Sequence, residues 1–300
     1  MKERGNKTRN ITKTFTKHFS CSETMNTLLN REHSIVLEEV EQAIDPLSGG
    51  LLGSLDSACG ILWGASLAAG IRAYNKFDEI DVAGAAAVYA TKRIVDEYKK
   101  ENEYPIDCRD ILGLKSKKWN FFKFLFKNGM SICYGNMIKW ELRFNEIIDY
   151  SLNEFDSKMI TRKPINCACD CMKKVAEAIN LDISNYEHIP AGLSGGIGLH
   201  GNGCGALGAA IFTQCLKYYI GRKKKSRDSM FRSHLQGLKI GDSWKNPSRR
   251  LHQAFMEKFG TMYCKKITKT SFSTIDDLSE YLSSGGCKEV IDSLASFASE

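Results

Sequence analysis

The 300-residue chain has little proline and no long apolar run. Only five residues are proline, and stretches such as 80–100 combine Ala, Glu, Lys, Val and Tyr with apolar positions that recur every three to four residues. This periodicity predicts helix rather than strand. The longest stretch without a charged residue, 188–216, is interrupted by Pro190, Asn202 and many glycines, whereas a membrane-spanning helix needs about 20 mainly apolar residues. We expect an all-α protein without a membrane span.

The N-terminal residues lack the pattern of a secretory signal. They are basic and rich in threonine, and no apolar segment or small-residue cleavage site follows, so a cytoplasmic location is expected. The net charge of +7 comes largely from an arm at 1–15 and from the run 222–227. Such runs are usually solvated arms or loops, and no aromatic-studded basic strand or recognition helix accompanies them. Nucleic acid is therefore not an expected partner.

Several kinds of catalytic site find no support. The six histidines are scattered, no acidic pair stands in a site motif, the glycine-rich segments lack the Lys-Ser/Thr of a phosphate-binding loop, and Cys-x-x-Cys-His is absent. The chain does contain eleven cysteines. In a reducing compartment an odd number of thiols is unsuited to a static disulfide framework, so metal binding, catalysis or a redox cycle must be considered first.

A short sequence occurs twice. Leu47-Ser48-Gly49-Gly50 recurs 146 residues later as 193–196, and each copy is followed by Cys-Gly, at Cys59 and at Cys204, which opens an apolar segment of small residues. The offset between the copies is 146 residues at the tetrapeptide and 145 at the cysteine, and such a repeat indicates an internal duplication.

Other cysteines recur in the same order. Cys21 and Cys171 each begin a helix-like run. The further pairs are Cys108 with Cys264 and Cys133 with Cys287. We therefore predict two homologous helical units, 16–155 and 164–300, packed about a pseudo-two-fold axis. The run 222–227 is interpreted as a surface insertion in the second unit.

The central cysteines stand near expected helix starts. Ser57 and Asn202 lie two residues before Cys59 and Cys204, and both are helix-capping residue types. A thiol in the first helical turn has a lowered pKa, so Cys59 and Cys204 are the predicted redox-active residues. Nearby glycines would let the backbone approach a cofactor, although they would equally allow close helix packing. These are Gly49, Gly50, Gly60, Gly195, Gly196 and Gly205.

The segment Cys204-Gly205-Ala206-Leu207-Gly208 resembles the central motif of the C_GCAxxG_C_C family. In the first copy, Cys59-Gly60-Ile61-Leu62-Trp63-Gly64 has the second glycine in register but isoleucine in place of alanine. Members of this family are described as redox-active proteins that are often encoded beside transporter genes, and a related unit occurs in a split-Soret cytochrome with an iron–sulfur centre. The resemblance implies redox chemistry or cluster binding, an unknown redox partner with a transporter association, and a conserved set of cysteines. By motif position these are Cys21, Cys59, Cys108, Cys133, Cys171, Cys204, Cys264 and Cys287.

The sequence leaves several functions open. Four thiolates per unit suit an iron–sulfur cluster or, as a weaker alternative, zinc, in an oxidoreductase or electron-transfer protein. The long spacings differ from typical metal motifs, in which two ligands lie within two to four residues of each other. A metal-free thiol–disulfide cycle and a partner-binding helical module with structural cysteines are the alternatives.

Four residues lie outside the family pattern. Cys167 and Cys169 could be alternative ligands or resolving thiols for Cys171, or could be inert. Cys215 is expected to be a buried packing residue. His200 is expected to pack within its loop.

Overall fold

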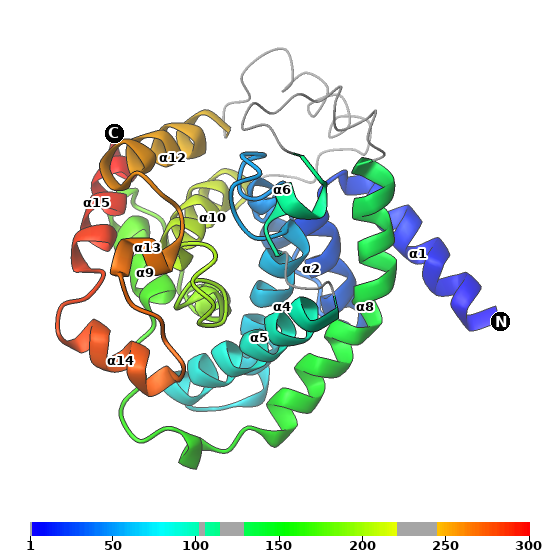
Figure 1. The fold of residues 1–300 in the computed structure, drawn as a ribbon, viewed down its shortest axis with the longest axis horizontal. Helices are drawn as coiled ribbons and strands as arrows, with labels where there is room; N and C mark the ends of the chain where they lie inside the picture. The colour runs from blue at the N-terminus through cyan, green and yellow to red at the C-terminus, as the bar shows by residue number, and fades with distance from the viewer. Residues whose placement is uncertain (1, 102–105, 115–128, 221–244) are drawn as a thin grey trace.

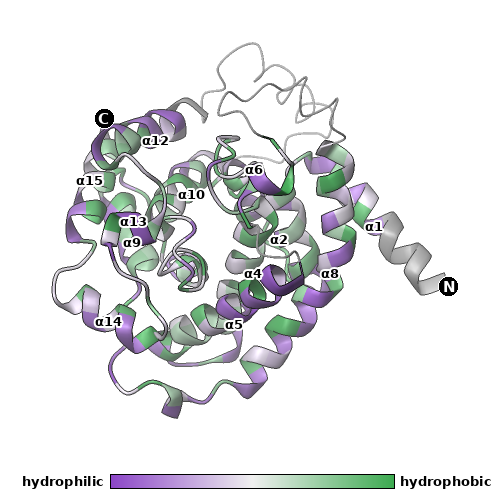
Figure 2. Ribbon diagram, viewed as in Figure 1, coloured by the Kyte–Doolittle hydropathy of each residue, from purple (hydrophilic) through white to green (hydrophobic). Residues whose placement is uncertain are grey.

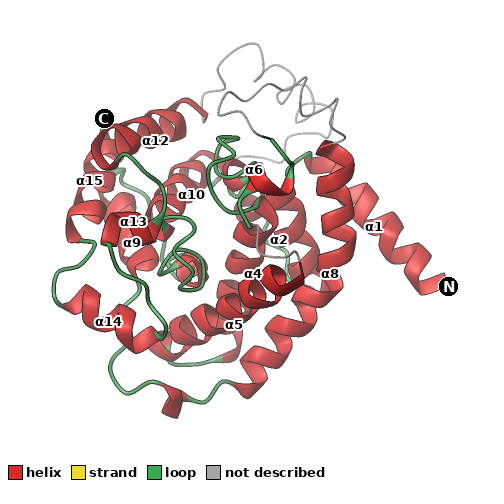
Figure 3. Ribbon diagram, viewed as in Figure 1, coloured by secondary structure: helices red, strands yellow, loops and turns green. Residues whose placement is uncertain are grey.

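The computed structural model describes residues 2–101, 106–114, 129–220 and 245–300, and all the regular elements within them are helices (Figures 1 and 3). This confirms the predicted all-α class. The α-helices are α1 (Lys2–His18), α2 (Cys21–Glu32), α3 (Glu38–Ala43), α4 (Gly60–Lys76), α5 (Ile80–Glu101), α6 (Cys108–Ile111), α8 (Gly129–Glu154), α9 (Cys167–Ala178), α10 (Gly205–Tyr219), α12 (Lys245–Phe259), α13 (Cys264–Thr268), α14 (Ile275–Ser283) and α15 (Lys288–Ser299). Short 3-10 helices are η1 (Asp45–Leu47), η2 (Ser157–Met159) and η3 (Ile189–Leu193).

The first unit is built on contacts among α2, α4, α5 and α8. Helix α2 begins at Cys21 because Ser20 caps it, its side chain accepting a hydrogen bond from the Glu23 amide at 3.3 Å. Helix α5 matches the segment expected from the periodicity at 80–100. Its alanines face the core and allow close packing against α4. Small residues therefore set the spacing of the central helices.

The second unit repeats the pairing of α2 with α4 in its own helices α9 and α10. Helix α9 begins at Cys167, and the Asn166 side chain caps it by accepting a hydrogen bond from the Cys169 amide at 3.0 Å. Helix α15 packs along α9, as α8 does along α2. Cys171, predicted to start this helix, instead lies one turn inside it, because the cap stands at Asn166.

The two units exchange equivalent contacts through one shared core. Helix α4 packs on η3, and α10 packs on η1 and α3. A Cβ added to Gly70 of α4 would lie 2.3 Å from the Ile189 carbonyl oxygen, so glycine permits this approach. The Ser57 hydroxyl donates to the Asn202 carbonyl at 3.2 Å, joining corresponding positions of the two units. These exchanged contacts are those expected of two units about an approximate two-fold axis, which stays a prediction.

Apolar residues are concentrated on the central helices α4 and α10, whereas hydrophilic residues are frequent on outer helices such as α12 (Figure 2). The N-terminal segment that was predicted as a basic arm forms helix α1. Ile11 and Phe15 of that helix are buried, and the Phe15 ring lies 6.1 Å from the ring of Tyr134 on α8. The basic run 222–227 lies outside the described residues. In the part of the chain that the structure describes, no helix is long and apolar enough to cross a membrane.

Candidate functional site: two groups of thiols

The four predicted cysteines of the first unit share one neighbourhood. Cys21 and Cys108 begin α2 and α6, Cys59 immediately precedes α4, and Cys133 lies in the first turns of α8. Burial raises the pKa of Cys108 first of all, and the nearby Cys59, Cys21 and Cys133 raise it further. Mutual interaction of this kind means that the thiols disfavour one another's ionisation. The structure therefore brings together residues that lie as much as 112 positions apart in the sequence.

The repeated tetrapeptide shapes the surroundings of Cys21. The backbone N–H of Gly49 and the hydroxyl of Ser48 both donate hydrogen bonds to its sulfur. Gly49 adopts a φ of 60°, a left-handed conformation that glycine tolerates without strain. A Cβ added to Gly60 would lie only 2.3 Å from the Cys21 sulfur. The start of α4 therefore leaves room for the Cys21 thiol only because residue 60 is glycine.

The structure reverses the pKa shift expected for the central cysteines. Cys59 and Cys204 are themselves the N-cap residues of α4 and α10, and neither lies in the first helical turn. Burial raises the pKa of each thiol to about 12, outweighing the hydrogen bonds from helical N–H groups. Ser57 bonds across to Asn202 instead of capping α4. At neutral pH both thiols are therefore protonated.

In the second unit, Cys167 occupies the place that Cys21 has in the first. It begins α9, accepts a hydrogen bond from the backbone N–H of Gly195, and contacts the Ser194 hydroxyl at 3.6 Å. Gly195 and Ser194 correspond to Gly49 and Ser48 in the repeat. Cys167 also lies 146 residues after Cys21, the spacing of the tetrapeptides themselves. The contacts thus assign this position to Cys167 and not to the predicted Cys171.

Cys167 and Cys287 form a thiol pair. A side-chain hydrogen bond joins them, and this bond lowers the pKa of Cys167 while raising that of Cys287. Cys204 and Cys264 interact electrostatically with both. Cys171 is fully buried next to Cys204 and Cys167, and burial raises its pKa. The second unit therefore gathers five thiols, among which Cys167 is the one whose ionisation is favoured.

A comparison with protein families matches the two segments that contain the two groups of thiols. A family profile described as "Putative redox-active protein (C_GCAxxG_C_C)" matches residues 19–137 and 165–300. The chain belongs to the C_GCAxxG_C_C family. The split of the match into two segments is consistent with two copies of the family unit, one around each thiol group. Comparison with curated proteins and with solved structures found no significant match.

The C_GCAxxG_C_C thiols are not arranged as a metal site. Within the described ranges, no group of three or more His, Cys, Asp or Glu side chains is placed to hold a metal ion. Four converging thiolates at metal–sulfur distances of about 2.3 Å are what a closed zinc or cluster site requires. The iron–sulfur or zinc ligand set therefore stays a prediction, and each unit's thiols share one region.

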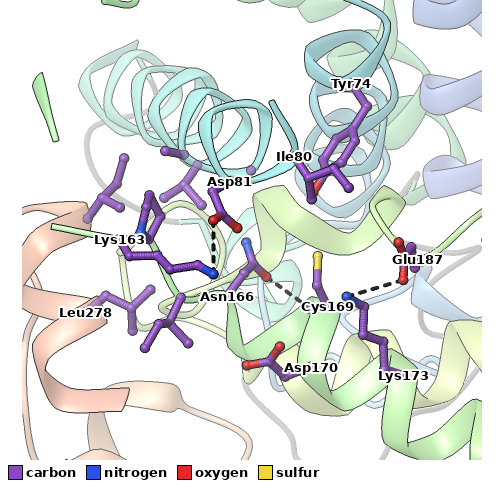
Figure 4. A pocket seen from close by; sticks show the side chains of 16 residues that line it. Tyr74, Ile80, Asp81, Lys163, Asn166, Cys169, Asp170, Lys173, Glu187 and Leu278 are labelled. Carbon is purple, nitrogen blue, oxygen red and sulfur yellow. Dashed lines mark hydrogen bonds and ion pairs between the residues drawn. The ribbon is translucent and has the colours of Figure 1, made fainter. Parts of the chain in front are cut away.

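Cys169 lines a pocket between the two units (Figure 4). The pocket has a volume of about 270 Å³ and also contacts Tyr74 of α4 and Asp81 of α5. Burial raises the pKa of Cys169. Asn166, on the pocket wall, accepts a hydrogen bond at 2.5 Å from the Ser194 hydroxyl that contacts Cys167. A short polar path thus joins the pocket to the second thiol group.

Two further predictions concern residues away from the thiol groups. Cys215 is fully buried in α10 and contacts the Ser248 hydroxyl at 3.4 Å, which confirms a packing role. His200 does more than pack within its loop, because its Nε2 lies 3.1 Å from a carboxylate oxygen of Asp96 on α5. His200 therefore links the second glycine loop to the first unit.

Sequence reasoning missed three residues that contact the thiols. Ser48 and Ser194 belong to the repeated tetrapeptide, and their recurrence at the same offset was an available signal. The third is Tyr98 of α5, whose side chain interacts with the Cys59 thiol. It lies 39 residues from that cysteine in the sequence and stands in no repeated pattern, so only the packing of α5 on α4 reveals it.

Proposed function

We propose that the chain is a thiol–disulfide redox protein in which Cys167 and Cys287 form the reversible pair of the second unit. The hydrogen bond between their thiols carries this proposal. Cysteines whose Cα atoms lie more than about 7 Å apart cannot form an S–S bond without backbone movement, so interacting thiols are the candidates for a reversible pair. Membership of a redox-active family supports the same chemistry.

The two sulfurs are suited to different steps. Cys287 is half-buried, whereas Cys167 is 4% exposed. In the oxidised pair, a thiolate R–S⁻ from a partner attacks the accessible Cys287 sulfur, the Cys167–Cys287 bond breaks, and Cys167 leaves as a thiolate. The lowered pKa of Cys167 favours that departure, because a thiol of low pKa leaves faster.

A second partner thiolate completes the cycle. It attacks the partner sulfur bound to Cys287, which releases R–S–S–R and the Cys287 thiolate, and this thiolate takes up a proton. Two electrons have then passed from two partner thiols to the protein, and the reverse reaction returns them to a partner disulfide. The expected partner is therefore a protein or small molecule with thiols or a disulfide.

The first proposal is tested by substituting Cys287 with serine. Cys287→Ser should abolish the second unit's two-electron couple, because Cys167 loses the sulfur with which it forms the bond. The measurement is a titration against oxidised and reduced dithiothreitol, with thiols counted by alkylation and mass spectrometry. Cys215→Ser is the matched control, since Cys215 is buried in the same unit but contacts Ser248. An intact couple in Cys287→Ser would rule the pair out.

An iron–sulfur cluster is the second candidate, and it has one specific observation in its favour. Backbone N–H groups donate to the thiols of both units, from Gly49 to Cys21 and from Gly195 to Cys167. Hydrogen bonds to sulfur are among the features that tune cluster potentials. Anaerobic purification with iron and sulfide analysis distinguishes the two candidates. Stoichiometric iron and sulfide would favour the cluster, and their absence together with a titrating dithiol would favour the thiol pair.

A further inference from the structure

One buried glycine of α5 leaves a space that close packing does not fill. Gly84 lies among alanines inside this helix, where glycine is less stabilising than alanine. Gly64 of α4 has a packing reason, since an added Cβ would lie 2.2 Å from the Ser22 carbonyl oxygen. An added Cβ on Gly84 would come no closer than 3.6 Å, to the Tyr74 hydroxyl, and would lie 4.0 Å from Asn166 Nδ2. These are ordinary contact distances, so packing does not explain Gly84.

The space beside Gly84 is the pocket between the two units (Figure 4). Gly84, Tyr74 and Asn166 all line it. Val88 of α5 and Leu278 of α14 add buried apolar surface from the first and the second unit. The volume of about 270 Å³ is slightly below the range of roughly 300–1,000 Å³ that is usual for drug-sized ligands. The pocket therefore suits a small molecule with an apolar body.

Hydrogen-bond acceptors remain available inside this pocket. The amide of Asn166 is already used, because its Nδ2 donates to the Ala191 carbonyl and its Oδ1 accepts from the Cys169 backbone N–H, both at 3.0 Å. The Cys169 thiol donates to the His188 carbonyl at 4.0 Å, and no described residue donates to its sulfur. The Tyr74 hydroxyl has no hydrogen-bond partner among the described residues. A ligand with several N–H donors can use the free sulfur and the phenolic oxygen.

The charged rim of the pocket has one carboxylate without a lysine partner. Lys163 lies 3.4 Å from a carboxylate oxygen of Asp81. Lys173 lies 3.2 Å from a carboxylate oxygen of Glu187. The Asp170 side chain forms no ion pair within 4 Å and no hydrogen bond with any described side chain. The three carboxylates and two ammonium groups leave a net negative charge, which favours a cationic ligand.

We propose that this pocket binds a small organic ammonium ion, whose charged group lies at Asp170 and whose apolar body fills the space beside Gly84. Binding is non-covalent, and the Cys169 sulfur serves as an acceptor in the wall. The site goes beyond the proposed thiol function and does not depend on it.

The charge preference is tested with phenethylamine, phenethyl alcohol and phenylacetate, which are similar in size and differ in charge. Calorimetric titration of the full chain should show one amine bound per chain, weaker binding of the alcohol and the weakest binding of the anion. Asp170→Asn should weaken amine binding about two- to fivefold, the usual effect of an exposed ion pair, and leave alcohol binding unchanged. Glu177→Gln is the matched control, because Glu177 is exposed on the same helix and does not line the pocket.

The location is tested by filling the pocket. Gly84→Leu should abolish binding of the amine and the alcohol, whereas Gly84→Ala adds one carbon at an ordinary contact distance and should retain it. Circular dichroism checks that both variants fold, and if Gly84→Leu does not, the comparison of Asp170→Asn with Glu177→Gln decides.

Three results would overturn the inference: no amine binding to wild type at millimolar concentration, equal binding of amine and anion, or unchanged amine binding in Asp170→Asn. Amine binding that persists in folded Gly84→Leu would also overturn it. Each of these results leaves the proposed thiol function standing, because the redox titration of Cys167 and Cys287 is a separate measurement.

Discussion

At the scale of single residues, the small space beside the cysteine sulfurs limits which side chains the neighbouring positions can carry. Gly60 is the clearest case, since a Cβ there would lie 2.3 Å from the Cys21 sulfur and 3.1 Å from the Ser48 Cα. The thiol and the backbone approach so closely that even one methyl group has no space. The glycines of the motif therefore serve close packing around thiols, one of the two roles that their pattern predicted.

Gly60→Ala should destabilise the protein by about 1–3 kcal/mol, the usual cost of forcing extra atoms into a packed core. Urea unfolding followed by circular dichroism measures the change. Gly135→Ala is the matched control, because Gly135 also lies in a helix and an added Cβ there would meet nothing within 4 Å. Helix propensity predicts a gain of up to about 1 kcal/mol at that position. Equal effects of the two substitutions would contradict this account of the close contact.

Individual residues also show what the sequence could and could not predict. The cysteines near the glycine loops were found because short motifs recur at a fixed spacing. The choice of Cys171 over Cys167 failed because helix starts were judged from local residue type, whereas the cap of α9, Asn166, stands five residues before Cys171. The direction of the Cys59 pKa shift also failed, because burial depends on the packing of distant segments. Local sequence carries neither kind of information.

At the scale of elements, α1 is joined to α2 by a buried pair of ionisable groups. His18 ends α1, and its Nδ1 contacts the Glu23 carboxyl in the first turn of α2. Burial lowers the pKa of His18 to about 4 and raises that of Glu23 well above its ordinary value of 4.5. These directions describe a neutral carboxylic acid in contact with a neutral imidazole, and the two helices meet without a buried charge.

This pair predicts a pH dependence of stability. A raised pKa in the folded state gives Glu23 a stabilising contribution that is complete below pH 4.5 and is lost as the pH rises through the folded pKa. Below pH 6.5 the contribution of His18 to the unfolding free energy changes in the opposite direction and rises with pH, because its folded pKa is lowered. Above pH 6.5 the contribution of His18 no longer changes, so the loss due to Glu23 should appear there as a fall in unfolding free energy with rising pH, by up to about 1.4 kcal/mol per pH unit.

Glu23→Gln should remove this loss. Chemical denaturation of wild type and variant between pH 6.5 and 8.5 measures the difference in unfolding free energy, which should change with pH by about that slope. Glu280→Gln should retain the wild-type profile, since the Glu280 side chain is 71% exposed. A wild-type profile that is parallel to that of Glu23→Gln would show that Glu23 is ionised in the folded protein.

At the scale of the whole molecule, two family units share one core yet differ in their thiols. The duplication predicted that two similar units would pack on each other. It did not predict the particular contacts, which are those of α4 with η3 and of α10 with η1. The sequence predicted that each unit would gather its cysteines, and the structure brings them into common neighbourhoods. It did not predict that Cys167 would pair with Cys287 in one unit while Tyr98 contacts Cys59 in the other. Tyr98 comes from α5, and Cys287 stands at the start of α15.

The most direct test of the central claim is disulfide mapping of the intact chain after equilibration with oxidised dithiothreitol. Free thiols are blocked, the chain is digested without reduction, and cross-linked peptides are identified by mass spectrometry. The account predicts a peptide joining Cys167 to Cys287 that disappears on addition of reduced dithiothreitol and reforms on reoxidation. Recovery of both residues as free thiols throughout, or a disulfide that joins Cys287 only to Cys171, would contradict it.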